Sequence, residues 1–233
     1  MNIAVITAAV GLKEGSLYDP KPTISSGYTD YFVFSDIDIP EHYRWKSRKI
    51  FVASQDEDYE ARRSAKIPKM LAHYLLPEYD YYIWHDYTHK VAIDPEKIIE
   101  NYLGDNDFAF FKHPQRDSWD TELEEVRRSN LDHGSLLDIQ KNHYNEVGVK
   151  KNQDFYECTC FVRRNNEIAN KTCSLWYDHA TKFSSRDQVS LPAAIQKYNP
   201  KISIMPGTCQ IYYGNNEIIP QFRHSLRIQN LIK

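Results

Sequence analysis

The sequence lacks a long apolar run, a basic tail and a basic stripe. The apolar stretch near its start covers only about eight positions, too few to span a bilayer, and no basic leader of the kind found in signal peptides precedes it. The net charge is −3, with acidic and basic residues mixed along the chain. We therefore expect a cytoplasmic protein with no transmembrane segment and no nucleic-acid partner.

Two motifs of other protein classes are also missing. The four cysteines, Cys158, Cys160, Cys173 and Cys209, include no C-x-x-C pair. Buried, inert thiols are the better expectation, although Cys158 and Cys160 on one face of a strand could offer two thiolates to a metal. No G-x-G-x-x-G follows the first predicted strand, so the dinucleotide-binding fingerprint is absent.

What the sequence contains is typical of one large globular core. Hydrophobic residues make up 41% and charged residues 26% of 233 residues, and no linker or repeat divides the chain, so we expect a single domain over 1–233. Tyrosine is abundant, with 17 residues. Tyrosine rings suit stacking on sugars and bases, but they also serve as ordinary core residues.

Apolar strand-like runs alternate with helical segments along the chain. The predicted strands are 2–10, 31–35, 49–53, 81–84, 108–111, 155–163, 202–205 and 210–213. The predicted helices are 68–76, one opened by Asp94, 117–129, 165–182 and one opened by Asp187. This alternation predicts an α/β fold with a mostly parallel mixed sheet flanked by helices. Ligands of such sheets bind beyond the carboxyl ends of the strands.

A basic segment precedes the first predicted helix. Residues 62–69 read RRSAKIPK, and Pro68 suits the first turn of a helix over 68–76. Cations at a helix start oppose the helix dipole, so this arrangement favours a phosphate ligand that both the helix amides and the side chains can bind. A solvated surface cluster is the alternative.

An acidic residue follows the fourth predicted strand. The segment YDYYIWHDYTH ends an apolar strand with Asp86. An aspartate at the carboxyl end of a strand points into the ligand crevice, where it can hold a divalent cation that bridges two phosphates. Taken alone, an aspartate after a strand is more often a turn residue.

Three blocks in register resemble a known family. The blocks are AKIPKMLAHYLLPEYDYYIWHDYTHKV, FAFFKHPQRDSWDTELEEV and SSRDQVSLPAAI, within residues 60–195. They resemble the glycosyltransferase-like family catalogued as domain of unknown function 616. They are also similar to the GT-A pattern of nucleotide-sugar-dependent glycosyltransferases, in which a basic helix precedes an apolar strand that ends in an Asp-x-Asp metal motif.

The resemblance implies a donor site and a metal site. Asp86 stands where the first acid of the metal motif is expected, whereas Thr88 replaces the second, which puts dependence on a divalent cation (Mn or Mg) in doubt. His89 or His224 could complete the metal shell. The residues implied to contact the nucleotide sugar are Arg62, Lys66 and Lys69 at the diphosphate, Thr7, Ala8 and Asp36 at the base and ribose, and Trp84 beside Asp86.

The third block supplies the catalytic candidates. Asp187 in SSRDQ is a sound helix cap by chemistry alone. As a catalytic carboxylate it could deprotonate an acceptor hydroxyl or stabilise the positive charge that develops on the sugar. We expect Arg186 and His113 beside it, with Glu157 as a second candidate acid.

These observations predict a glycosyltransferase within a GT-A-like domain. Residues 1–112 would form the nucleotide-sugar-binding half and 113–233 the acceptor side, with a glycan or lipid-linked hydroxyl as acceptor. Two alternatives stay open. One is a non-catalytic nucleotide-sugar-binding domain, because one metal acid is missing. The other is a ceramidase-like hydrolase, because a plant member of the resembled family is described as acting on ceramide.

Overall fold

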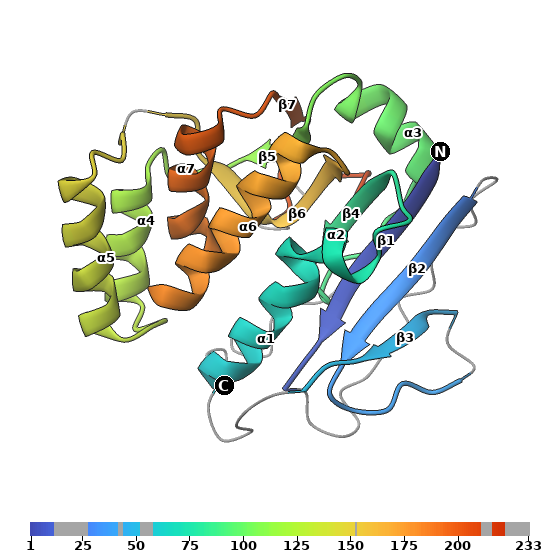
Figure 1. Cartoon of the computed structure of the whole chain (residues 1–233), viewed down its shortest axis with the longest axis horizontal. Coiled ribbons are helices and arrows are strands. Elements are labelled where there is room, and N and C mark those ends of the chain that lie inside the picture. Colours follow the sequence, from blue (N-terminus) through green and yellow to red (C-terminus); the bar gives the residue numbers. More distant parts are fainter. Residues whose placement is uncertain (12–27, 42–43, 52–57, 152, 211–215, 222–233) are drawn as a thin grey trace.

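Seven strands form one mixed sheet in the order β3-β2-β1-β4-β6-β5-β7 (Figure 1). The computed structural model describes residues 1–11, 28–41, 44–51, 58–151, 153–210 and 216–221. The strands are β1 (Asn2–Ala9), β2 (Tyr28–Ser35), β3 (Lys46–Lys49), β4 (Tyr81–His85), β5 (Phe108–Lys112), β6 (Tyr156–Arg164) and β7 (Ile202–Met205). β6 is antiparallel to both neighbours, and every other neighbouring pair is parallel. The predicted α/β class with a mostly parallel mixed sheet is therefore confirmed.

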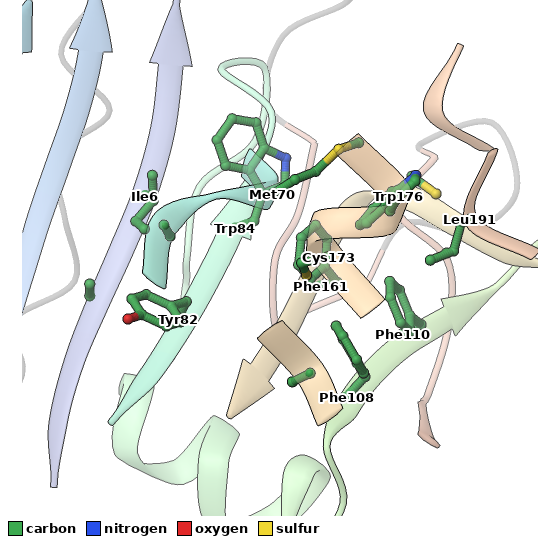
Figure 2. Packing of buried hydrophobic residues seen from close by; sticks show 14 of the residues in the cluster. Ile6, Met70, Tyr82, Trp84, Phe108, Phe110, Phe161, Cys173, Trp176 and Leu191 are labelled. Atoms are coloured by element: carbon green, nitrogen blue, oxygen red, sulfur yellow. The ribbon is translucent and has the colours of Figure 1, made fainter. Parts of the chain in front are cut away.

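Both faces of the sheet are covered, as the continuous apolar run of β1 requires. The helices are α1 (Asp58–Met70), α2 (Ala72–Leu75), α3 (Pro95–Ile98), the π-helix η1 (Ile99–Leu103), α4 (Trp119–Arg128), α5 (Gly134–Glu146), α6 (Glu167–Lys182) and α7 (Asp187–Tyr198). One core joins the sheet to α1, α2, α6 and α7, and Figure 2 shows it from Ile6 through Trp84 to Leu191. A second core joins the other face to α3 and η1. None of the described helices is long and apolar enough to cross a bilayer.

A third core packs α4 and α5 beside α7 (Figure 1). Helix α5 was not predicted from the sequence, because its polar positions give it a weak amphipathic pattern. The predicted cap at Asp94 is confirmed, since its carboxylate accepts the Glu96 N–H at 3.1 Å. β3 ends where the strand over 49–53 was predicted to begin, and its four residues are exposed. Most of the predicted strand 210–213 lies outside the described residues.

The prediction that Pro68 opens a helix is wrong. Pro68 lies inside α1, which already includes Asp58, and the basic residues at 62–69 therefore occupy its middle and last turns. Cations near a helix C-terminus complement the dipole instead of opposing it. The argument for a phosphate at this helix start therefore fails, and the lysines must be interpreted from their contacts.

The segment that leads into α7 is held by one buried carboxylate. Asp132 Oδ2 accepts the Ser185 N–H at 2.7 Å and the hydroxyls of Ser184 and Ser185 at 2.8 and 2.9 Å. Burial opposes ionisation, but these bonds and the His133 N–H outweigh it and hold the pKa of Asp132 below its usual value. Asp132 therefore fixes the backbone immediately before Asp187.

We expect Asp132→Ala to lower the free energy of unfolding by about 3 kcal/mol, because the variant leaves a buried N–H and two hydroxyls without their acceptor. The stabilising contribution is present above a pH of about 4 and is lost as the pH falls below that, since the folded state has the lower pKa. Urea unfolding at neutral and acidic pH measures both effects. Asp138→Ala removes an exposed carboxylate that contacts Arg127 at 2.5 Å and should change stability little. Equal losses in the two variants would contradict the anchoring role.

Candidate active site

Two lysines of α1 meet the first residue of α7 at the carboxyl edge of the sheet. Lys66 and Lys69 are three residues apart and therefore share one helix face. Lys66 Nζ lies 3.0 Å from Asp187 Oδ2, and Lys69 Nζ contacts the same oxygen. The Lys69 side chain is 3% exposed and that of Asp187 is 11% exposed. These three side chains form a buried ion cluster, here called the Lys–Asp cluster.

The charges of the Lys–Asp cluster stabilise one another. Burial by itself would raise the pKa of Asp187, but Lys66 and Lys69 hold it well below its usual value. Burial also opposes the charge of Lys69, yet Asp187 and Asp86 raise its pKa. The pKa of Lys66 is lowered, chiefly by burial and also by the charge of Lys69. Asp187 is therefore an ionised carboxylate at neutral pH.

Asp187 is not the cap of α7. Arg186 occupies the N-cap position, and no side chain caps that helix start. The interpretation of Asp187 as a helix cap is therefore wrong, since the helix cap position lies one residue earlier. The Asp187 carboxylate turns toward α1 instead, because two buried ammonium groups there need a counter-ion.

Asp86 extends the cluster to the surface. It directly follows β4, and its Oδ1 lies 3.6 Å from Lys69 Nζ and accepts the Trp84 indole N–H at 3.0 Å. Its side chain is 45% exposed. A partly exposed carboxylate over a buried ion cluster can reach a ligand or a cation in solvent.

Two tryptophans enclose Lys69. Its Nζ lies 5.4 Å from the ring centre of Trp84 and 6.0 Å from that of Trp176. The Trp176 indole N–H donates to the backbone oxygen of Asp187 at 2.8 Å. These rings exclude water from the ammonium group and add cation–π stabilisation, so that Lys69 is fixed in place.

A second group of charges adjoins the first. Glu122 of α4 is 2% exposed and is in contact with Arg116 Nε. Burial raises the pKa of Glu122, and the charges of Arg116 and Arg186 counteract this. Arg186 Nε is buried and has no hydrogen-bond partner among the described residues. Glu122 therefore pairs with Arg116, and its charge also interacts with that of Arg186 beside the Lys–Asp cluster.

The sheet is irregular next to these residues. The register of β6 against β5 shifts, so that Phe110 pairs with Phe161 and Phe111 with Glu157. Cys158, at this shift, is buried and feels the charge of Asp187. Burial raises its pKa well above the usual value, so its thiol is inert. All four cysteines are buried and unpaired, as expected.

The structure brings together six of the residues singled out in the sequence. They are Lys66, Lys69, Trp84, Asp86, Arg186 and Asp187. His113 follows β5 and adjoins the second group, because its Nδ1 accepts the Arg116 N–H at 3.0 Å. Sequence reasoning missed Glu122 and Trp176. In the sequence, Glu122 is one of several acids in a helical segment that begins at Trp119, and Trp176 is the only tryptophan of α6. Neither pattern distinguishes a site residue from an ordinary helix or core residue.

Two predicted residues point elsewhere. Arg62 donates to the Leu131 backbone oxygen at 2.7 Å and thereby binds α1 to the segment before α5. Glu157 lies on the opposite face of the sheet, where its carboxylate accepts from Thr208 at 3.0 Å and from the Cys209 N–H at 2.6 Å. Alternation along β6 separates it from Tyr156 and Cys158, which face α6 and α7. Glu157 is therefore not a second acid beside Asp187.

The three residues expected to contact the base and ribose do not lie on one face of the sheet. Thr7 shares the face of Val5 and Ala9 and is buried, whereas Ala8 lies on the α1 side. Asp36 accepts the Gly11 N–H at 3.2 Å.

Of the two proposed additional metal ligands, the structure describes only His89, whose ring nitrogens contact groups other than Asp86. His89 is buried, with Nε2 2.8 Å from the Cys209 backbone oxygen and Nδ1 2.9 Å from the Thr88 hydroxyl. His224 lies outside the described residues. In the described part of the chain, no group of three or more His, Cys, Asp or Glu side chains is arranged to hold a metal ion.

Comparisons with known proteins agree with this fold. A probable hexosyltransferase, MUCI70 of Arabidopsis thaliana, is 27% identical over 152 residues, which is 61% of this chain and 26% of that protein. The alkaline ceramidase TOD1 of Arabidopsis thaliana is 24% identical over 201 residues, which is 81% of this chain and 43% of that protein. This chain thus spans less than half the length of either relative.

A solved structure shows a related fold. The apo structure of the bifunctional glycosyltransferase WbbM matches with a TM-score of 0.50 and 12% identity, over 88% of this chain and 39% of that one. The family model of the TOD1/MUCI70 glycosyltransferase-like domain matches residues 41–224, which include β3 to β7 and every residue of the Lys–Asp cluster. The chain belongs to the TOD1/MUCI70 glycosyltransferase-like domain family.

Proposed function

We propose that the protein transfers a sugar from a nucleotide-diphosphate donor to a hydroxyl of a glycan or lipid-linked acceptor, on a GT-A-like domain. The observation that carries the proposal is the Lys–Asp cluster with Asp86 and Arg186 at its rim, at the sheet edge where ligands of α/β proteins bind. Family membership and the relative named as a probable hexosyltransferase support the same chemistry.

Charge balance supports a divalent cation in this site. The two groups contain four basic and three acidic side chains, and with all of them ionised they carry one net positive charge; these are Lys66, Lys69, Arg116, Arg186, Asp86, Glu122 and Asp187. A donor with two ionised phosphate groups would leave the site negative, and a divalent cation would restore the balance. Asp86 is the residue that fits the cation, with phosphate oxygens and water as its other ligands. The cation would neutralise charge on the leaving diphosphate.

Asp187 supports stabilisation of the transferring sugar better than proton removal. In the transfer, the bond from the anomeric carbon to the diphosphate breaks with its electron pair on the leaving diphosphate, a bond to the acceptor oxygen forms, and the acceptor proton passes to solvent. A general base works best with a pKa near the operating pH. The two lysines hold the pKa of Asp187 far below that, so its fixed negative charge suits the positive charge that develops on the sugar.

Ceramide hydrolysis has weaker support. It rests on the relative named alkaline ceramidase. Amide hydrolysis requires an activated nucleophile or water. In the described portion of the site, the Cys158 thiol has a raised pKa, and both serine hydroxyls before Arg186 donate to Asp132. Release of fatty acid from ceramide without any nucleotide would favour this alternative.

Asp86→Asn should remove the manganese-dependent part of the affinity for nucleoside diphosphates, because the cation loses its protein carboxylate. Calorimetric titration with and without manganese measures the effect. Asp178→Asn is the matched control, since that aspartate is also lysine-paired and has a 43% exposed side chain. If wild-type protein binds nucleotides equally well in chelator, the cation assignment fails.

Asp187→Asn should slow hydrolysis of the donor sugar by about a hundredfold or more, which is the range for loss of one group that stabilises charge in the transition state. The variant should also be about 3–5 kcal/mol less stable, because two buried lysines lose their counter-ion. Asp132→Ala is the control for that loss, since it loosens the same segment and leaves the charges of the site in place. Release of free sugar and nucleoside diphosphate from a panel of nucleotide sugars is measured at a temperature where all variants are folded. Equal slowing of the two variants would show that Asp187 is structural.

A further inference from the structure

A cleft opens at the carboxyl end of β5, where the chain turns into α4. One cavity of about 280 Å³ is lined by Lys112, His113, Arg116, Asp117, Asp154 and Phe155. A neighbouring hollow of about 540 Å³ is lined by Asp117, Ser118, Lys151, Gln153 and Asp154. The two share Asp117, Gln153 and Asp154, so they form one extended depression, here called the β5 cleft.

His113 in this cleft has a fixed tautomer. Its Nδ1 accepts the backbone N–H groups of Gln115 at 3.2 Å and Arg116 at 3.0 Å. Burial, together with the charge of Arg116, lowers the pKa of His113 to about 4, so the ring is neutral at pH 7 and its proton resides on Nε2. A nitrogen that carries a proton cannot serve as a base. The sequence predicts His113 as a catalytic residue beside Asp187. With this tautomer, His113 can donate a hydrogen bond from Nε2 but cannot take up a proton there.

The Nε2–H group of His113 has no acceptor. His113 is 5% exposed, and Nε2 is a buried atom without a hydrogen-bond partner among the described residues. Buried polar groups are nearly always hydrogen-bonded, and each exception requires an explanation. A ligand oxygen that enters the cavity His113 lines would supply the missing acceptor.

The charged residues of the cleft already have partners. Lys112 Nζ lies 3.6 Å from Asp154 Oδ1, Lys151 Nζ lies 2.7 Å from Asp120 Oδ2, and Arg116 contacts Glu122. No lining cation of the described cleft is thus left free for an anionic ligand. The lining instead offers hydrogen-bond donors and acceptors, whereas the rings of His113 and Phe155, whose centres lie 5.5 Å apart, are buried. A neutral ligand with many hydroxyl groups matches this set.

We propose that the β5 cleft binds the acceptor carbohydrate, and that His113 Nε2–H donates a hydrogen bond to one of its oxygens. This inference rests on the proposed glycosyl transfer and names the acceptor side of the same site. The Arg116–Glu122 pair connects the cleft to Arg186 and Asp187, which places the acceptor next to the charges that act on the donor. The two adjoining hollows suit successive units of a sugar chain, with one unit in the smaller cavity and the next in the larger hollow.

The test uses the full chain without nucleotide. Neutral mono- and disaccharides of glucose, galactose, mannose and xylose are titrated while the side-chain ¹H–¹⁵N signals of the histidines are recorded, with inorganic phosphate as an anionic probe. We expect at least one neutral saccharide to shift the Nε2–H signal of His113, and phosphate to leave it unchanged. His113→Asn keeps an acceptor near the two backbone N–H groups and removes the Nε2 donor, so it should weaken saccharide binding about tenfold. His143→Asn, on α5, is the control and should bind as the wild type does.

Each outcome separates this inference from the proposed function, because donor hydrolysis is measured on the same preparations. If no neutral saccharide shifts the His113 signal, or if phosphate shifts it instead, the acceptor cleft is overturned even where a nucleotide sugar is hydrolysed. If saccharides bind and His113→Asn weakens them while no nucleotide sugar is hydrolysed, the cleft stands and glycosyl transfer fails. Asp154→Asn alters an exposed lining carboxylate and should also weaken binding, which keeps the test valid if His113→Asn does not fold.

Discussion

The ion cluster of Lys66, Lys69 and Asp187 is the constraint on which the rest of the site depends. Buried charges cost several kcal/mol each unless they are paired, so two ammonium groups on one face of α1 require a carboxylate opposite them. Asp187 satisfies that requirement only if α7 begins against α1. This fixes the direction of α7 and brings Arg186, the residue before it, to the carboxyl edge of the sheet. Asp86 arrives at the same edge because β4 ends there.

Two further buried carboxylates near the cluster also bind the donors around them. Asp132 accepts three hydrogen bonds from the segment before α7, and Glu122 holds Arg116 and contributes to the field at Arg186. Two buried acids, Asp132 and Asp187, thus fix the start of α7 through direct contacts, and the charge of Glu122 acts on Arg186 beside them. A site fixed by packing and hydrogen bonds of this kind is preorganised, which is what transition-state charge stabilisation requires.

The sequence predicts the sheet better than it predicts the site. Strands such as β1 and β5 are continuous apolar runs, and the Asp94–Pro95 helix start depends only on local chemistry, so both can be read directly. Pro68 misled the prediction because the turns of α1 before it are mostly polar. A proline two residues before the last residue of a helix looks the same in the sequence as a proline at a helix start. Asp187 in the SSRDQ block and Glu157 on the predicted strand 155–163 are both candidate catalytic acids in the sequence. Only the alternation of β6, with its register shift, places Glu157 on the other face. Glu122 has no motif, since its importance arises from arginines that approach it in the folded chain.

A donor bound at the proposed site would compete with Asp187 for the charge of the cluster lysines, and this competition would link binding to catalysis. In the structure, Lys66 and Lys69 neutralise Asp187. A diphosphate at the sheet edge would attract the same ammonium groups, which weakens their hold on the carboxylate. If the phosphate drew the charge of Lys66, the more accessible of the two lysines, the negative charge of Asp187 would become available to the sugar attached to that phosphate, and the pKa of Asp187 would rise. The carboxylate would then act most strongly when the donor is bound, while in the free protein the two lysines keep it neutralised.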